Sequence, residues 1–188
     1  MDRSSLNPDA IALEDAFFAK ENRRLLEEMR ARHREDVRRE QIKSALGGVD
    51  NSVAARLLEL GLEPETVLAL AVVPLAMVAW ADGEVQSKER EAILAAAAER
   101  GVVLGTPAHA VLSTWLENRP GAELFDAWKR YVAAIWPQMS EADRIEMRER
   151  VLGRARRVAE AAGGFLGLGS KVSEAEEQVL EELDLALS

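Results

Sequence analysis

The chain has 188 residues, a formal net charge of −9 and no cysteine. An acidic balance of this size argues against nucleic acid as the main ligand, because phosphate binding requires a basic face. The lack of cysteine excludes disulfides, thiolate zinc sites and cysteine nucleophiles. Apolar residues make up 48% of the chain and aromatic residues only 5%. With Ala and Leu dominant, this composition predicts an all-α fold with a real core.

The sequence predicts a soluble cytoplasmic protein. Residues 1–5 are polar and no apolar run follows them, so we expect no signal peptide. The longest apolar stretch, 67–81, is interrupted by Pro74 and is too short to span a bilayer. We therefore expect no membrane span.

Residues 1–50 differ from the rest of the chain. Asn7 and Pro8 are a helix start signal, and no proline or glycine follows from Asp9 to about Leu46. Ten basic and eleven acidic residues make this segment nearly neutral, whereas 14 basic residues meet 22 acidic ones downstream. We therefore expect a charged helical appendage at 1–50 and a helical domain at 51–188.

The predicted N-terminal helix has only a thin apolar stripe, made of Phe18, Leu25, Met29, Val37, Ile42 and Leu46. A stripe this thin cannot bury a long helix, so the helix packs along its own domain or against a second copy of itself. Its arginines could meet nucleic acid or acidic lipid. Interleaved glutamates and aspartates favour a solvated, ion-paired face instead. These arginines are Arg23, Arg24, Arg30, Arg32, Arg34, Arg38 and Arg39.

The remaining helices are predicted from capping residues at their starts and from glycine or proline at their ends. A short helix runs from Asp50 or Asn51 to Leu60, and a second, apolar nearly all round, leads to Trp80 with a kink at Pro74. The glycine-rich stretch 163–169 reads as a connector, because it lacks the strand and the lysine of a phosphate-binding loop. No segment has a period of two, so we predict a bundle of about seven to eight helices. Further helices are predicted at 88–100, from 106 to near 118, at 124–136, at 141–162 and from Ser173 onward.

An acidic turn joins the helix that ends at Trp80 to the next one. Three carboxylates, Asp82, Glu84 and Glu89, can converge there on a hard divalent cation. Calcium or magnesium is favoured over zinc, because no histidine or cysteine is nearby. The alternative is a tight Asp82-Gly83 turn, with Glu89 only stabilising the start of its helix.

The acidic turn has an internal echo. Residues 85–90 can be laid over 172–177, which places Glu89 on Glu176 and Ile93 on Leu180. This match predicts two pseudo-repeated helix hairpins. The same offset places Asp82 on Gly169 and Glu84 on Lys171, so only the first hairpin keeps the turn carboxylates.

The turn Ala81-Asp82-Gly83-Glu84-Val85, with Glu89 and Ile93, resembles the first motif of the tellurite-resistance TerB-like domain. The stretch 164–167, followed by Val172, Ser173 and Glu176, resembles that family's second half. The two matches frame residues from about 60 to 187. The resemblance implies a compact bundle, a role in bacterial stress responses, and divalent metal ions, calcium among them, near Asp82, Glu84 and Glu89.

We therefore expect a non-enzymatic stress-response protein that acts as a helical interaction module, with one divalent cation at the acidic turn. A protein partner or self-association is expected, and no small-molecule substrate is evident. One alternative is a metal-independent adaptor that associates through the N-terminal helix. Another is a hydrolase using a carboxylate-bound metal, although the sequence shows no nucleophile elbow or base beside the turn. His33 and His109 read as solvated surface residues, and the four tryptophans as core.

Overall fold

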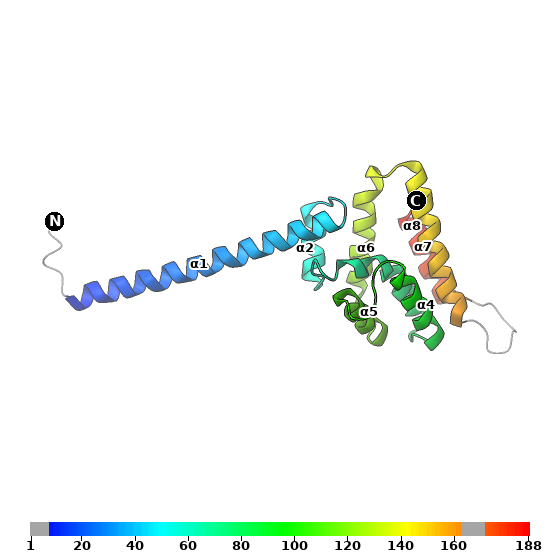
Figure 1. Ribbon diagram of the computed structural model, residues 1–188, viewed down its shortest axis with the longest axis horizontal. Helices are drawn as coiled ribbons and strands as arrows, with labels where there is room; N and C mark the ends of the chain where they lie inside the picture. The colour runs from blue at the N-terminus through cyan, green and yellow to red at the C-terminus, as the bar shows by residue number, and fades with distance from the viewer. Residues whose placement is uncertain (1–7, 163–171) are drawn as a thin grey trace.

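The computed structural model describes residues 8–162 and 172–188, and the side chains of 17–161 and 172–188 (Figure 1). Over these ranges the protein is all-helical, with eight α-helices and no strand, which confirms the predicted fold class. Two 3₁₀ segments, η2 (Val67–Val72) and η3 (Trp136–Gln138), adjoin the α-helices. The α-helices are α1 (Pro8–Ala45), α2 (Asn51–Glu59), α3 (Val73–Ala79), α4 (Ser87–Ala98), α5 (Pro107–Glu117), α6 (Ala122–Ile135), α7 (Glu141–Ala162) and α8 (Glu174–Ala186).

Helix α1 leaves the body of the molecule as a single rod, and only its C-terminal end packs on the other helices (Figure 1). Ile42 is fully buried in the core and Leu46 packs against it. Gly47 and Gly48 end the helix with φ of 78° and 88°, the left-handed conformation that glycine adopts without strain. The predicted cap Asn7 lies outside the described residues.

The apolar stretch before the acidic turn differs from its prediction as one kinked helix. It consists of η2, which ends at Val72, and the separate α-helix α3, in which Pro74 occupies the first turn. An N–H in the first turn has no intrahelical partner, so proline costs nothing there, whereas it would break a helix interior. Pro74 therefore starts a helix and does not kink one. Leu68 of η2 is exposed, so this stretch is not buried on every side.

Helices α3 and α4 form one hairpin, and α7 and α8 form another. Helix α3 packs against α7, α4 packs against α7, and α3 packs against α8. Exchanging α3 with α7 and α4 with α8 leaves this set of neighbours unchanged, as expected for two hairpins related by a pseudo-twofold axis. The glycine-rich stretch 163–169 between α7 and α8 lies outside the described residues.

The core is filled by aliphatic side chains of α2 to α8 around Trp128, which is 2% exposed. The other three tryptophans are partly buried, and the Trp80 indole N–H donates to the Trp115 carbonyl at 2.7 Å. Ile145 of α7 is 53% exposed. Within the described ranges, no helix combines the length and apolarity needed to cross a membrane.

Candidate functional site

The acidic turn lies between α3 and α4 and is open to solvent. Asp82 and Glu84 are exposed, and the Glu84 N–H donates to the Asp82 carboxylate at 3.3 Å. Gly83 between them has a φ of 103°, which a side chain would strain. The turn is thus closed by its own backbone and the Asp82 side chain.

Glu89 occupies a different environment, although it follows the turn closely. It is 1% exposed, and its carboxylate accepts the Gln86 N–H at 2.8 Å in a capping box that begins α4. Burial raises the pKa of Glu89 from an ordinary value of 4.5 to about 7. The Gln86 N–H opposes this rise, while the negative charges of Glu176 and Asp82 add to it.

Glu176 is the counterpart of Glu89 in the second hairpin. It is 4% exposed and accepts the Ser173 N–H at 2.6 Å in the capping box that begins α8. The charge of Glu176 and its side-chain hydrogen bonding both raise the pKa of Glu89, so the protonated form of Glu89 is favoured beside Glu176. In the described part of the chain these are the two buried charged side chains. The sequence echo aligned them without indicating that they interact.

The three predicted metal ligands do not share one environment. Asp82 and Glu84 point to solvent, whereas Glu89 is buried and already accepts a backbone N–H. Across residues 17–161 and 172–188, no set of three or more His, Asp or Glu side chains is placed to hold a metal ion. The residues present therefore do not fit a divalent cation in this geometry, and metal binding at Asp82, Glu84 and Glu89 stays a prediction.

We expect calcium or magnesium to bind this turn no more tightly than about 10⁻³ M, because two exposed carboxylates supply too few oxygen ligands. Isothermal titration of the wild type and of Asp82→Ala should give weak, matching heats. Saturable binding that Asp82→Ala abolishes would contradict this expectation and restore the predicted three-carboxylate site.

A second candidate site is the outer part of α1. From residue 17 to residue 38 every side chain is exposed except that of Glu21, which is partly buried. Six large apolar side chains lie on this segment, and the most exposed, Met29, is 66% accessible. Isolated apolar residues are ordinary on a surface, but this many along one projecting helix make it a candidate binding surface. The six are Phe17, Phe18, Leu25, Leu26, Met29 and Val37.

The apolar residues of α1 do not face the body. Successive residues turn by about 100° around a helix. Met29 and Val37 each lie about 140° around the helix from Ile42, the residue that anchors α1 in the core. We call the set Phe18, Leu25, Leu26, Met29 and Val37 the α1 stripe. It lies away from the side of α1 that packs on α2.

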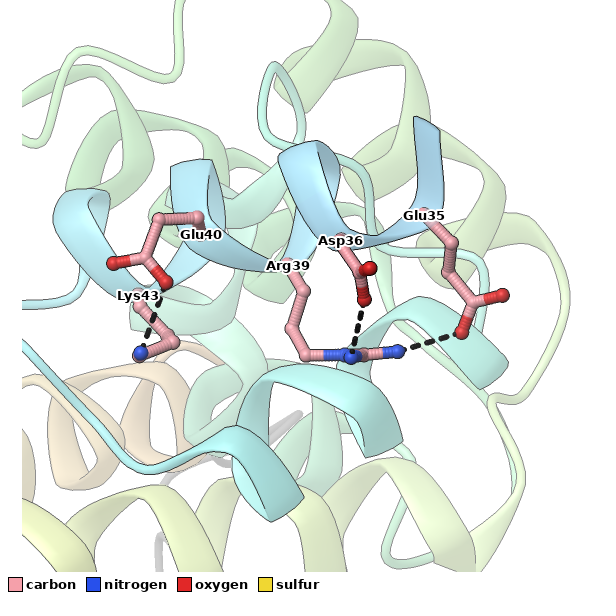
Figure 2. A network of polar contacts seen from close by, with 5 residues as sticks. All are labelled: Glu35, Asp36, Arg39, Glu40 and Lys43. Carbon is pink, nitrogen blue, oxygen red and sulfur yellow. Dashed lines mark hydrogen bonds and ion pairs between the residues drawn. The ribbon is translucent and has the colours of Figure 1, made fainter. Parts of the chain in front are cut away.

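Ion pairs on α1 confirm part of the charge interpretation. Arg39 is paired with Glu35 and Asp36 at 2.7 and 3.0 Å, and Lys43 with Glu40 at 2.9 Å (Figure 2). Arg24 is likewise paired with Glu21 and Glu28, and Arg38 with Glu63 on the body at 2.8 Å. Arg30, Arg32 and Arg34 form no ion pair with the residues that the structure describes. The interleaved acids therefore neutralise only some of the arginines.

Two open grooves lie beside α8. One, of about 560 Å³, runs between α7 and α8 and is crossed by ion pairs from Arg148 to Asp184 and from Arg156 to Glu177. The other, of about 630 Å³, lies between α6 and α8 beside Trp136. Neither groove reaches the acidic turn. His33 is exposed, and the His109 Nδ1 lies 3.4 Å from the Ser113 hydroxyl.

Comparison of the chain with protein families, with curated proteins and with solved structures finds no match. The resemblance to the TerB-like domain therefore rests on its motifs alone, and part of its second motif, residues 164–167, lies outside the described residues.

Proposed function

We propose that this protein is a non-catalytic interaction module that binds another polypeptide through the α1 stripe. The observation that carries this proposal is a projecting helix whose large apolar side chains are exposed and turned away from its own domain. A helix-in-groove or helix–helix contact buries such residues at helical spacing. The cost of exposing them in the free chain is offset when a partner covers them.

The body serves this module as an anchor. Ile42 and the Arg38–Glu63 ion pair fix the base of α1, so the stripe has a defined direction relative to α2. The sequence suggested either a module with a divalent cation at the acidic turn or a metal-independent adaptor that associates through the N-terminal helix. The exposed stripe on α1 favours association through the N-terminal helix. The stress-response role implied by the TerB-like resemblance remains a prediction about where such a module works.

A charge placed in the stripe tests the proposal. We expect Leu25→Asp to remove a bound partner while leaving the fold intact, because Leu25 is 45% exposed and contacts no core residue of its own domain. Leu104→Asp is the matched control, since Leu104 is 85% exposed and lies far from α1 in the chain.

The measurement is affinity purification of the three proteins from their native host, with a second, differently tagged copy of the chain present. Each partner found is then purified and its affinity measured directly. A partner kept by Leu104→Asp and weakened at least tenfold by Leu25→Asp is the expected result. Equal binding by all three proteins would overturn the proposal.

A further inference from the structure

The junction of α4 and α7 gathers four arginines on a chain whose net charge is −9. The two helices pack side by side (Figure 1). Arg150, Arg154 and Arg157 lie on one face of α7, because residues three or four positions apart are neighbours on a helix surface. Arg154 and Arg157 line a crevice against α4, and Arg100 follows the C-terminal end of α4. Positive charge is therefore concentrated locally on an acidic protein.

The crevice between α4 and α7 has a volume of about 210 Å³. Its α4 wall consists mainly of alanines, and its α7 wall carries Arg154, Arg157 and Val158. Glu99 is the one acid among the described residues that line it, and its carboxylate accepts from the Arg154 guanidinium at 2.6 Å. Binding sites for drug-sized molecules are larger than this, so the crevice suits a small anionic group.

Nearby carboxylates compensate only part of the positive charge. Glu99 and Glu146 each form an ion pair with one of the four arginines, at 2.6 and 2.9 Å. Arg100 and Arg157 have no ion pair with any residue that the structure describes. Four guanidinium groups are thus set against two carboxylates, and both of these carboxylates are largely exposed.

Arg100 is sensitive to this excess of positive charge. Partial burial, together with the charges of Arg150 and Arg154, lowers the pKa of Arg100, while Tyr131 and Glu99 act in the opposite direction. The Arg150 Nε is also buried and has no hydrogen-bond acceptor among the described residues. A bound anion would reduce the repulsion among these guanidinium groups.

We propose that the crevice between α4 and α7 binds a phosphate monoester through Arg100, Arg154 and Arg157. Guanidinium groups present paired N–H donors that match the geometry of phosphate oxygens. A phosphate monoester is close to a dianion at pH 7, which matches the two positive charges left uncompensated in the cluster. This site is separate from the α1 stripe and adds a ligand to the proposed function.

The rival interpretation is that these arginines serve only ion pairs within the chain. Glu99→Gln distinguishes the two interpretations, because Glu99 competes with a bound phosphate for Arg154. Removing the Glu99 charge should therefore tighten phosphate binding severalfold. The Glu99 side chain is 59% exposed, so the substitution should leave the fold intact.

The test uses glycerol 3-phosphate as a soluble probe and vesicles containing phosphatidic acid as the lipid form of the same headgroup. Calorimetry and vesicle sedimentation at constant ionic strength compare the wild type, Glu99→Gln and the double variant Arg100→Gln, Arg157→Gln. The matched control, Arg30→Gln with Arg34→Gln, removes the same charge from exposed and unpaired positions of α1.

We expect the wild type and the control to bind glycerol 3-phosphate equally and the double variant to bind at least tenfold more weakly. Wild-type binding should weaken by up to about tenfold from pH 7.5 to pH 5, because the phosphate monoester gains its second proton near pH 6. Binding to vesicles alone, lost in the double variant, would keep the phosphate site and assign a lipid as its source.

Absence of saturable binding to either probe, or equal binding by the wild type and the double variant, would overturn this site. Unchanged binding by Glu99→Gln would overturn the role of Arg154. Leu25→Asp should bind glycerol 3-phosphate as the wild type does, because Leu25 lies on α1. The phosphate site and the proposed function can therefore fail separately.

Discussion

Replacing Glu89 by glutamine will stabilise the protein by about 3 kcal/mol at pH 8 and leave its stability near pH 4.5 almost unchanged. Glu89 titrates at about 7 in the folded protein, above its ordinary value of 4.5. The folded state therefore holds a proton that the unfolded state releases. This contribution is fully present below about pH 4.5 and is lost as the pH rises through 7.

Glutamine imitates the protonated side chain. Its amide oxygen can accept the Gln86 N–H, and its amide N–H can donate to the Glu176 carboxylate. Glu89→Gln should therefore keep the capping box of α4 and its link to α8. Neutralising Glu89 also removes the repulsion by Glu176 and Asp82 that opposes its ionised form.

The measurement is urea unfolding of wild type and variant at half-unit intervals from pH 4.5 to 8. The matched control is Glu141→Gln, which removes an exposed glutamate from the first turn of α7. We expect the control to follow the wild-type pH profile. Profiles of wild type and Glu89→Gln that run parallel over this range would refute the assigned proton.

Shortening Ile42 to alanine will destabilise the protein by about 3 kcal/mol, within the range of about 2 to 5 measured for such core truncations. Ile42 is fully buried and is the point where α1 enters the core beside α2. Removing three carbon atoms there loses apolar burial and leaves a cavity that the surrounding helices can only partly close.

Val37→Ala is the matched control, because Val37 lies on the same helix but is 42% exposed. Its effect on the free energy of unfolding should stay within about 0.5 kcal/mol. Urea unfolding followed by circular dichroism measures both. Equal effects of the two substitutions would mean that the base of α1 is not held by the core.

Local signals explain why much of the fold could be predicted. The capping box at Ser173 and Glu176 and the Thr106 cap before Pro107 are formed by residues within one turn, and both lie where expected. Gly47 and Gly48 end α1 because glycine adopts a positive φ without strain. A helix cap or a helix end depends on a few residues that are adjacent in the chain. The local sequence is therefore enough to predict it.

What the sequence did not predict depends on packing between distant segments. Proline at position 74 is compatible with a kink or with a first turn, and the surrounding helices decide between them. Glu89 was grouped with Asp82 and Glu84 because these residues are close in sequence, but α4 turns it inward toward Glu176, 87 positions away. The aligned position of Glu176 in the internal echo was the signal that could have indicated this pair.

The outward reach of α1 has a consequence for how the chain is ordered. The exposed part, residues 17–38, extends roughly 33 Å and meets the body at its base, through the Arg38–Glu63 ion pair. Most helical stability in proteins comes from packing of an apolar face, and ion pairs between exposed side chains such as Arg24 and Glu28 add little. Under the proposed function, a partner bound to the α1 stripe supplies that packing. If a partner covers the stripe, mass action makes the order of α1 depend on the concentration of that partner.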